Sequence, residues 1–284
     1  MTNLDPRRHA FREDLAAKNL RGLVEARRYV SGERRQVAES ALPLRRAPRF
    51  DAPLDTEVLH GETLTVYDES EGWAWVQLDH DGYVGYVPNA ELVPPRAPAT
   101  HRIATLRTYV FPEPDAKAPP LALLSLNALV RLAEEGGRYA RLDTGGYVYA
   151  SHIVPADHRV PDFVAVAEGF LGAPYLWGGR SSLGLDCSAL VQMALAACAI
   201  ACPRDSDMQQ NELGEPVDPG RLDEVARGDL IFWRGHVAIA AGAGMLVHAN
   251  AHHMMVVREP QDAAVARIAA AGLEVRAIRR LFRS

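Results

Sequence analysis

The sequence has few cysteines and no excess of positive charge. Only Cys187, Cys198 and Cys202 occur in 284 residues, and such an odd, sparse set argues against a disulfide framework and suits a reducing compartment. Lysine and arginine number 31 against 36 acidic residues, which gives a net charge of -5. Because nucleic-acid binding requires a basic surface, we expect no nucleic-acid partner.

Long apolar runs are also missing. No run approaches the roughly 18 apolar residues that a bilayer-spanning helix needs, and the first thirty residues hold no uninterrupted apolar segment of the signal-peptide kind. These absences predict a cytoplasmic protein with no membrane partner. Apolar residues make up 48% and charged residues 24%, as in folded globular proteins, and the length suits two or three domains.

The first part of the chain changes character near residue 36. Residues 1–35 are rich in Arg, Glu and Ala, with apolar residues such as Leu15 and Leu20 at loosely helical spacing, which predicts a helical N-terminal arm. Short β-type runs divided by Gly, Pro and Asp follow, and they predict a small all-β domain over residues 36–94. The proline-rich stretch 93–100 predicts a linker.

The β-type pattern occurs twice. Residues 72–93 and 137–154 both place an aromatic residue three positions before a Leu-Asp pair and then continue with Gly-Tyr-Val, at a constant offset of 64 residues. The repeat predicts a second copy of the module over residues 99–155. Both copies resemble bacterial SH3-like domains, whose last strands carry this pattern, so the resemblance implies two small all-β barrels.

Residues 160–284 differ in kind from the repeated modules. Two helices are expected, over about 162–171 and 187–201, and four strands follow in "GDLIFWRG", "HVAIAAG", "MLVHAN" and "MMVVREP". Helices that precede an antiparallel sheet indicate an α+β domain.

Cys187 stands between a glycine-rich loop and the start of the second predicted helix. The positive end of the helix dipole favours a thiolate and lowers the thiol pKa, and backbone N–H groups there are available to an oxyanion. Gly178, Gly179 and Gly184 would let the backbone approach a substrate closely. We therefore expect an ionised cysteine nucleophile.

Two histidines could serve this cysteine. His236 opens one strand and His248 closes the next, with glycine-rich turn material between them, so a turn centred on Gly242 would set them directly opposite each other. One imidazole would take the thiol proton and the other would orient it. A lone cysteine or strand histidine is usually structural, but the three together favour nucleophilic catalysis.

The stretches "GAPYLWGGRSSLGLDCSALVQ", "PRDSDMQ", "RGDLIFW", "GHVAIAAG" and "MLVHAN" resemble, in order and spacing, the NlpC-type cell-wall peptidases. The resemblance implies a papain-like fold with Cys187 as nucleophile, His236 as general base and His248 as the third, orienting residue. It implies no metal or organic cofactor. Cys198 and Cys202 lie four apart and could ligate a metal, but structural zinc needs four ligands, so we favour core packing.

Relatives that resemble the whole architecture cut the γ-D-glutamyl to diamino-acid bond of released murein peptides and require a free N-terminal L-alanine. The resemblance assigns substrate-binding roles to further residues. Asp186 and Tyr83 would bind the ammonium, and Trp177 would form a wall. The remaining predicted contacts to the peptide backbone or the D-glutamate carboxylate come from Ser188 and Ser206, in a pocket shaped by Arg204 and Asp205.

Most of the substrate-binding assignments have a structural alternative. Trp177 could be a core aromatic residue, Ser188 could bond to backbone at the helix start, Arg204 and Asp205 could form a structural ion pair, and Tyr83 could simply favour a strand. We expect a cytoplasmic cysteine endopeptidase of murein-peptide recycling. The alternatives are an inactive murein-binding protein, an acyltransferase on the same Cys-His fold, and an exported enzyme acting on intact murein; the oligomeric state is open.

Overall fold

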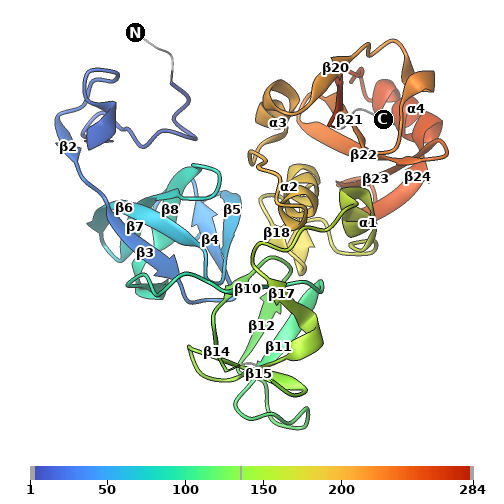
Figure 1. Ribbon diagram of the computed structural model, residues 1–284. Coiled ribbons are helices and arrows are strands. Elements are labelled where there is room, and N and C mark those ends of the chain that lie inside the picture. The colour runs from blue at the N-terminus through green and yellow to red at the C-terminus, as the bar shows by residue number, and fades with distance from the viewer. Residues whose placement is uncertain (1–3, 135, 282–284) are drawn as a thin grey trace. The chain divides into compact units, whose positions relative to one another are not determined.

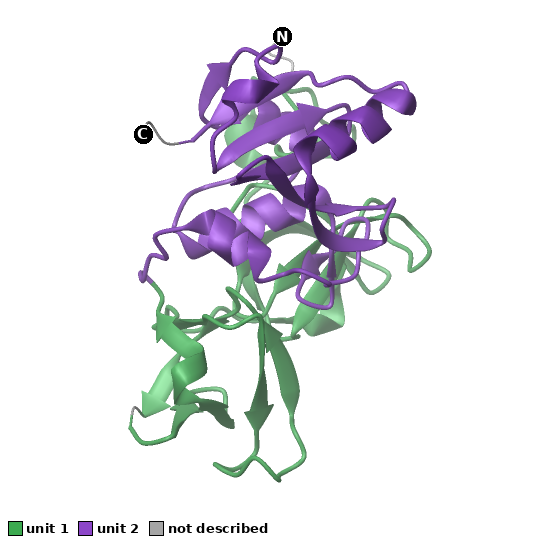
Figure 2. Ribbon diagram, turned by 90° about the vertical axis from the view of Figure 1, so that its right-hand side faces the viewer, with its two compact units in different colours: residues 1–156 green, residues 157–284 purple. Residues whose placement is uncertain are grey.

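The computed structural model describes residues 4–134 and 136–281. The chain divides into two compact units, Met1–Ala156 and Asp157–Ser284, which Figure 2 shows in different colours. The amino-terminal unit is built almost wholly from strands. The carboxy-terminal unit combines helices with one antiparallel sheet.

The amino-terminal segment is not helical, so the predicted helical arm is wrong. The described residues 4–35 contain no α-helix; they form β1 (Leu15–Ala17), a 3-10 turn (Lys18–Leu20), the parallel strand β2 (Arg28–Val30) and the start of β3. All three residues of β1 are buried, which a helix burying one face would not achieve. Leu15 and Leu20 share a core cluster with Trp75, and this tertiary packing outweighs local propensity.

Within the described chain, seven strands form the first sheet, in the order β5-β4-β8-β7-β6-β3-β9. They are β3 (Glu33–Val37), β4 (Ala41–Arg45), β5 (Leu54–Leu59), β6 (Thr63–Ser70), β7 (Trp73–Leu78), β8 (Val84–Pro88) and β9 (Leu92–Val93). Alternate residues are buried, as Leu42 and Leu44 illustrate on β4. This period of two gives the sheet one core-facing side.

The region from 101 to 155 holds two further sheets among the described residues, ordered β13-β10-β17 and β12-β11-β16-β15-β14. Their strands are β10 (His101–Ile103), β11 (Arg107–Phe111), β12 (Ala122–Ser125), β13 (Leu129–Val130), β14 (Leu132–Glu134), β15 (Tyr139–Leu142), β16 (Tyr147–Tyr149) and β17 (Ile153–Pro155). Every pair is antiparallel, as in a chain of hairpins.

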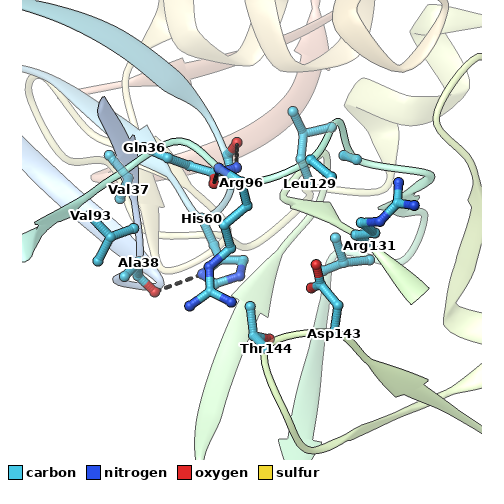
Figure 3. Close-up of a pocket in the computed structure, with 14 residues that line it drawn as sticks. Gln36, Val37, Ala38, His60, Val93, Arg96, Leu129, Arg131, Asp143 and Thr144 are labelled. Atoms are coloured by element: carbon cyan, nitrogen blue, oxygen red, sulfur yellow. Dashed lines mark hydrogen bonds between the residues drawn. The ribbon is translucent and has the colours of Figure 1, made fainter. Parts of the chain in front are cut away.

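The two β regions of the amino-terminal unit meet at a backbone contact. The Leu129 N–H donates to the His60 carbonyl at 2.8 Å, and a Cβ on Gly61 would lie 2.1 Å from the Leu129 carbonyl oxygen. Gly61 also has φ +80°, so only glycine fits this approach. A pocket of about 250 Å³ lies beside the contact, and Arg96 and Asp143 also line it (Figure 3).

The carboxy-terminal unit contains a six-stranded antiparallel sheet among its described residues, ordered β20-β25-β21-β22-β23-β24 (Figure 1). The strands are β20 (Glu215–Val217), β21 (Asp229–Trp233), β22 (His236–Gly242), β23 (Met245–Asn250), β24 (Met255–Pro260) and β25 (Ala277–Arg280). The helices are α1 (Phe163–Glu168), α2 (Cys187–Ala197), α3 (Ser206–Glu212) and α4 (Gln261–Ala270), and a small hairpin joins β18 (Arg180–Ser181) to β19 (Gly184–Leu185).

The helices differ in part from the sequence-based prediction. Both predicted helices exist, but α1 ends at Glu168 and α2 ends at Ala197, where Ala199 takes φ +57° and stops the helix. The short helix α3 and the later helix α4 were not predicted. Helix α2 packs against β22 and β23, whereas α4 packs against β23 and β24.

The register of the two histidine strands also differs from the prediction. The pairs Ile239↔Val247 and Ala240↔Leu246, followed by an irregularity before Gly242, shift the alignment by two residues from a turn centred on Gly242. His236 and His248 are therefore offset instead of directly opposite. A two-residue offset keeps both side chains on one face of the sheet, so the two histidines can still contact each other.

In the described part of the chain, we find no helix with the length and apolar character that a bilayer crossing demands.

Candidate active site

Cys187 is the first residue of α2, and the residue before it caps that helix. The Asp186 side chain accepts a hydrogen bond from the Ala189 N–H at 2.8 Å, the arrangement that favours a helix start at this point. Cys187 is buried, with 7% of its surface exposed. A cap thus fixes the nucleophile position at the end of a buried helix.

The glycine loop before α2 is shaped by its own backbone. Gly178 has φ +75° and donates its N–H to Asp186 Oδ2 at 3.0 Å. A Cβ on Gly179 would lie 2.5 Å from the Gly184 carbonyl oxygen, which is too close for any side chain. These glycines therefore let the loop fold onto itself and onto Asp186.

The thiol of Cys187 is less acidic than the sequence suggested. Burial, reinforced by the negative charge of Asp186, raises the pKa of Cys187 to about 12. The N–H groups of Val237 and Ser188 interact with the sulfur and lower the pKa, but they do not overcome burial. The expectation of a resting thiolate is wrong, because desolvation outweighs the helix dipole here. The Val237 contact places the sulfur beside the residue that follows His236.

The two histidines form a direct hydrogen bond. His236 Nε2 lies 2.8 Å from His248 Nδ1, and the ring centroids are 5.0 Å apart. Burial, with the charges of His248 and Arg267, lowers the pKa of His236 to about 3. Burial also lowers the pKa of His248, so both rings are neutral at pH 7. Because Nε2 of His236 is engaged, Nδ1 is its nitrogen available as a base.

Asp186 lies at the centre of a buried polar cluster. Its two oxygens accept five hydrogen bonds of 2.7–3.0 Å from the described residues. The donors are Gly178 N–H, Ala189 N–H, Ser188 Oγ and two nitrogens of Arg204. Burial favours the neutral acid, but Arg204 and the backbone donors hold the pKa of Asp186 below its usual range. Arg204 is only 1% exposed, so this ion pair organises the helix start.

The remaining predicted residues lie in different surroundings. Asp205 occupies the N-cap position of α3 and Ser206 is its first residue, partly exposed. Trp177 is 63% exposed, which rules out the core-aromatic alternative. Tyr83 belongs to the amino-terminal unit and directly precedes β8; its contact with a substrate stays a prediction.

The structure adds three residues that the sequence reasoning missed. Tyr175 lies near the nucleophile: burial, together with the charges of Cys187 and Asp186, raises its pKa, so its hydroxyl stays protonated. Glu259 Oε1 lies 2.6 Å from His248 Nε2 and forms an ion pair with Arg267 of α4. The alternation of side chains along β24 could have indicated Glu259, since it lies two residues after Val257, the cross-strand partner of His248, and so shares its face. A tyrosine in a quoted motif was the only signal for Tyr175.

The described residues contain no group of three or more His, Cys, Asp or Glu side chains placed to hold a metal ion. The site itself offers a buried thiol, two hydrogen-bonded imidazoles and a protonated tyrosine hydroxyl.

A buried cysteine at a helix start beside a histidine pair on an antiparallel sheet defines a cysteine peptidase of the papain-like kind. Residues 172–270 match the NlpC/P60 family and residues 44–92 match the bacterial dipeptidyl-peptidase SH3 domain. The chain therefore carries an SH3-like domain followed by an NlpC/P60 domain.

Named relatives and one solved structure are similar to the chain over most of its length. The chain is 27% identical to dipeptidyl-peptidase 6 of Lysinibacillus sphaericus, over 72% of this chain and 82% of that protein. It is 29% identical to γ-D-glutamyl-L-lysine dipeptidyl-peptidase of Bacillus subtilis, over 70% and 73%. The crystal structure of an NlpC/P60 family protein from Bacillus cereus shares the fold, with a TM-score of 0.75, 22% identity and coverage of 88% and 100%.

Proposed function

We propose that this protein hydrolyses the γ-D-glutamyl to diamino-acid bond of murein peptides that carry a free N-terminal L-alanine. The diamino acid would be meso-diaminopimelate or lysine. Two matched relatives are named γ-D-glutamyl-L-lysine dipeptidyl-peptidases. The observation that carries the proposal is that the Cys187 sulfur interacts with the Val237 N–H, and that the preceding residue, His236, has its Nε2 held by His248.

The acylation step follows from the two neutral groups. His236 Nδ1 takes the thiol proton as the Cys187 sulfur attacks the γ-carbonyl carbon, so the thiolate forms only when it is used. The carbonyl oxygen becomes an oxyanion, which backbone N–H groups at the start of α2 and the Tyr175 hydroxyl would stabilise. The proton on His236 then passes to the diamino-acid nitrogen, the C–N bond breaks, and a thioester remains on Cys187.

Deacylation reverses the roles. His236 Nδ1 removes a proton from water as the water oxygen attacks the thioester carbon. The second oxyanion collapses, the C–S bond breaks, and His236 returns the proton to the Cys187 sulfur. The products are the L-Ala-D-Glu dipeptide and the released diamino acid or its peptide.

We further propose the substrate contacts that the family resemblance assigns. Trp177 would flank the peptide because its ring is exposed beside the loop. Ser206 would bind the peptide backbone or the D-glutamate carboxylate, in a pocket that Asp205 helps to shape. Asp186 and Tyr83 would attract the ammonium. Since Asp186 already accepts five hydrogen bonds, its part is an electrostatic one, and Ser188 and Arg204 hold it in place.

Residues 99–155 are proposed as a second SH3-like domain. In both β regions a hairpin, β7–β8 or β15–β16, is followed by a 3-10 turn and a short strand. We also propose a cytoplasmic location and a role in recycling released peptides. An odd, sparse set of three cysteines suits a reducing compartment. Cell fractionation tests the location.

The proposal is tested with purified protein and the tripeptide L-Ala-γ-D-Glu-meso-diaminopimelate, free and N-acetylated, with products followed by mass spectrometry. We expect cleavage of the free peptide, a much lower kcat/KM for the blocked one, and no turnover by Cys187→Ala. Equal kcat/KM for both peptides would reject the recognition of the ammonium.

The alternatives give different outcomes in the same assay. Murein pull-down without hydrolysis would show a binding protein, and products joined to an added amine would show an acyltransferase. A Cys187→Ala variant that keeps more than a few percent of wild-type turnover would reject the cysteine mechanism.

A further inference from the structure

We propose that Glu259 and Arg267 are positioning residues of the peptidase site, which hold both histidines in the tautomers that the general-base step requires. The inference rests on the proposed function and extends it beyond the three predicted catalytic residues. We call His236, His248, Glu259 and Arg267 the histidine–glutamate network.

The network is continuous and mostly buried. His236 Nε2 and His248 Nδ1 are 2.8 Å apart, and His248 Nε2 and Glu259 Oε1 are 2.6 Å apart. His248 is 1% exposed, and the side chains of Glu259 and Arg267 are 14% and 27% exposed. Each member comes from a different element: β22, β23, β24 and α4 (Figure 1).

The hydrogen bonds determine which nitrogen of each imidazole carries the hydrogen. A carboxylate only accepts, so His248 Nε2 must carry a hydrogen and donate it to Glu259. A neutral imidazole has one hydrogen, which leaves His248 Nδ1 as an acceptor for the hydrogen on His236 Nε2. His236 Nδ1 then has a free lone pair, the state that can accept the thiol proton of Cys187. The carboxylate thus determines the tautomer two rings away.

Arg267 keeps both histidines in these neutral tautomers near pH 7. A lone carboxylate beside His248 would favour the imidazolium form, whose Nδ1–H would donate to His236 Nε2. The hydrogen of His236 would then have to lie on Nδ1, and the base would be lost. Arg267 neutralises Glu259, and its charge disfavours protonation of both histidines.

Other charged groups face the two rings. A positive charge on His253, in the turn after β23, would also disfavour protonation of His248, whereas Asp186 beside the start of α2 favours protonation of His236. Neither makes a hydrogen bond to a histidine nitrogen that the structure records. Among the described residues, Glu259 is therefore the acidic group that selects which nitrogen of His248 carries the hydrogen.

The test compares Glu259→Met, Glu259→Gln and Arg267→Met with wild type in the full chain. The tripeptide assay gives kcat and KM, and long-range ¹H–¹⁵N spectra of the imidazoles report the tautomers. A matched control is Arg258→Met, because Arg258 is the neighbour of Glu259 on β24 and pairs with Glu168 at 3.5 Å. Circular dichroism checks that each variant is folded.

We expect Glu259→Met to lower kcat about 10- to 100-fold with little change in KM, part of the roughly 10²- to 10⁴-fold that a positioned general base contributes. Glu259→Gln should stay within about threefold of wild type, because its amide oxygen still accepts from Nε2. Arg267→Met should move the acid limb of kcat/KM to higher pH by about one unit. Arg258→Met should change none of these.

Wild-type kcat and an unchanged His248 tautomer in Glu259→Met would overturn the inference, as would an unshifted acid limb in Arg267→Met. If Glu259→Met does not fold, the other two variants decide. A wild-type protein that cleaves no murein peptide would refute the proposed function instead, while the spectra would still test the network.

Discussion

The buried pair of Asp186 and Arg204 offers a quantitative test of how the nucleophile helix is held. Asp186→Asn keeps the size of the side chain but removes its charge. Whichever position the amide nitrogen takes, it meets donors, because Oδ2 accepts from Gly178 N–H and Arg204 Nη2 and Oδ1 accepts from three other donors. At least two hydrogen bonds are therefore lost, and a guanidinium that is 1% exposed loses its counter-ion.

The expected cost is about 3–5 kcal/mol, the range for removing one partner of a buried ion pair. The double variant Asp186→Asn/Arg204→Met also removes the orphaned charge, so its loss should be smaller than the sum of the single losses by about 1–3 kcal/mol. Arg227→Met is the control, because its pairs with Asp162 and Glu168 are exposed and should be worth less than about 1 kcal/mol.

The assay has to follow the carboxy-terminal unit alone. The four tryptophans divide between the two units, with Trp73 and Trp75 in one and Trp177 and Trp233 in the other, so total fluorescence would mix two transitions. Urea-dependent hydrogen exchange of peptides from α2, read by mass spectrometry, isolates the relevant opening. A loss below about 1 kcal/mol for Asp186→Asn, or strictly additive losses in the cycle, would refute the reasoning.

Cys187 and Gly179 allow the same helix start and loop to be tested in two further ways. Iodoacetamide should alkylate Cys187 faster with rising pH, without a plateau between pH 6 and 10, because burial raises the thiol pKa to about 12. The Cys187→Ala variant gives the background reaction of the other cysteines. A plateau in the alkylation rate below pH 8 would contradict the neutral resting thiol. Gly179→Ala should destabilise the carboxy-terminal unit by about 1–3 kcal/mol, since its Cβ would lie 2.5 Å from the Gly184 oxygen; an unchanged urea midpoint in the α2 peptides would show that the loop relaxes freely.

Local sequence patterns predicted the structure correctly where a single short segment determines it. The glycine loop before Cys187 and the alternation along β22 and β23 are properties of short windows, so the helix start and the histidine face were predictable. The N-terminal arm was mispredicted because its apolar residues pack against Trp75, which lies about sixty positions away in the chain. The register of the two histidine strands was mispredicted, because the irregularity near Gly242 that shifts it has no clear signature in the sequence.

By itself, the sequence indicated an SH3-like region ahead of an NlpC/P60 domain, with Cys187 at a helix start and the two histidines on one strand face, because these features depend on motifs and spacing within short windows. Only the tertiary structure decided the charge states and the supporting contacts. Burial makes Cys187 and His236 neutral, Arg204 reaches Asp186 from another segment, and α4 brings Arg267 to Glu259. Desolvation and long-range contacts depend on how the whole domain packs, and no local pattern records them.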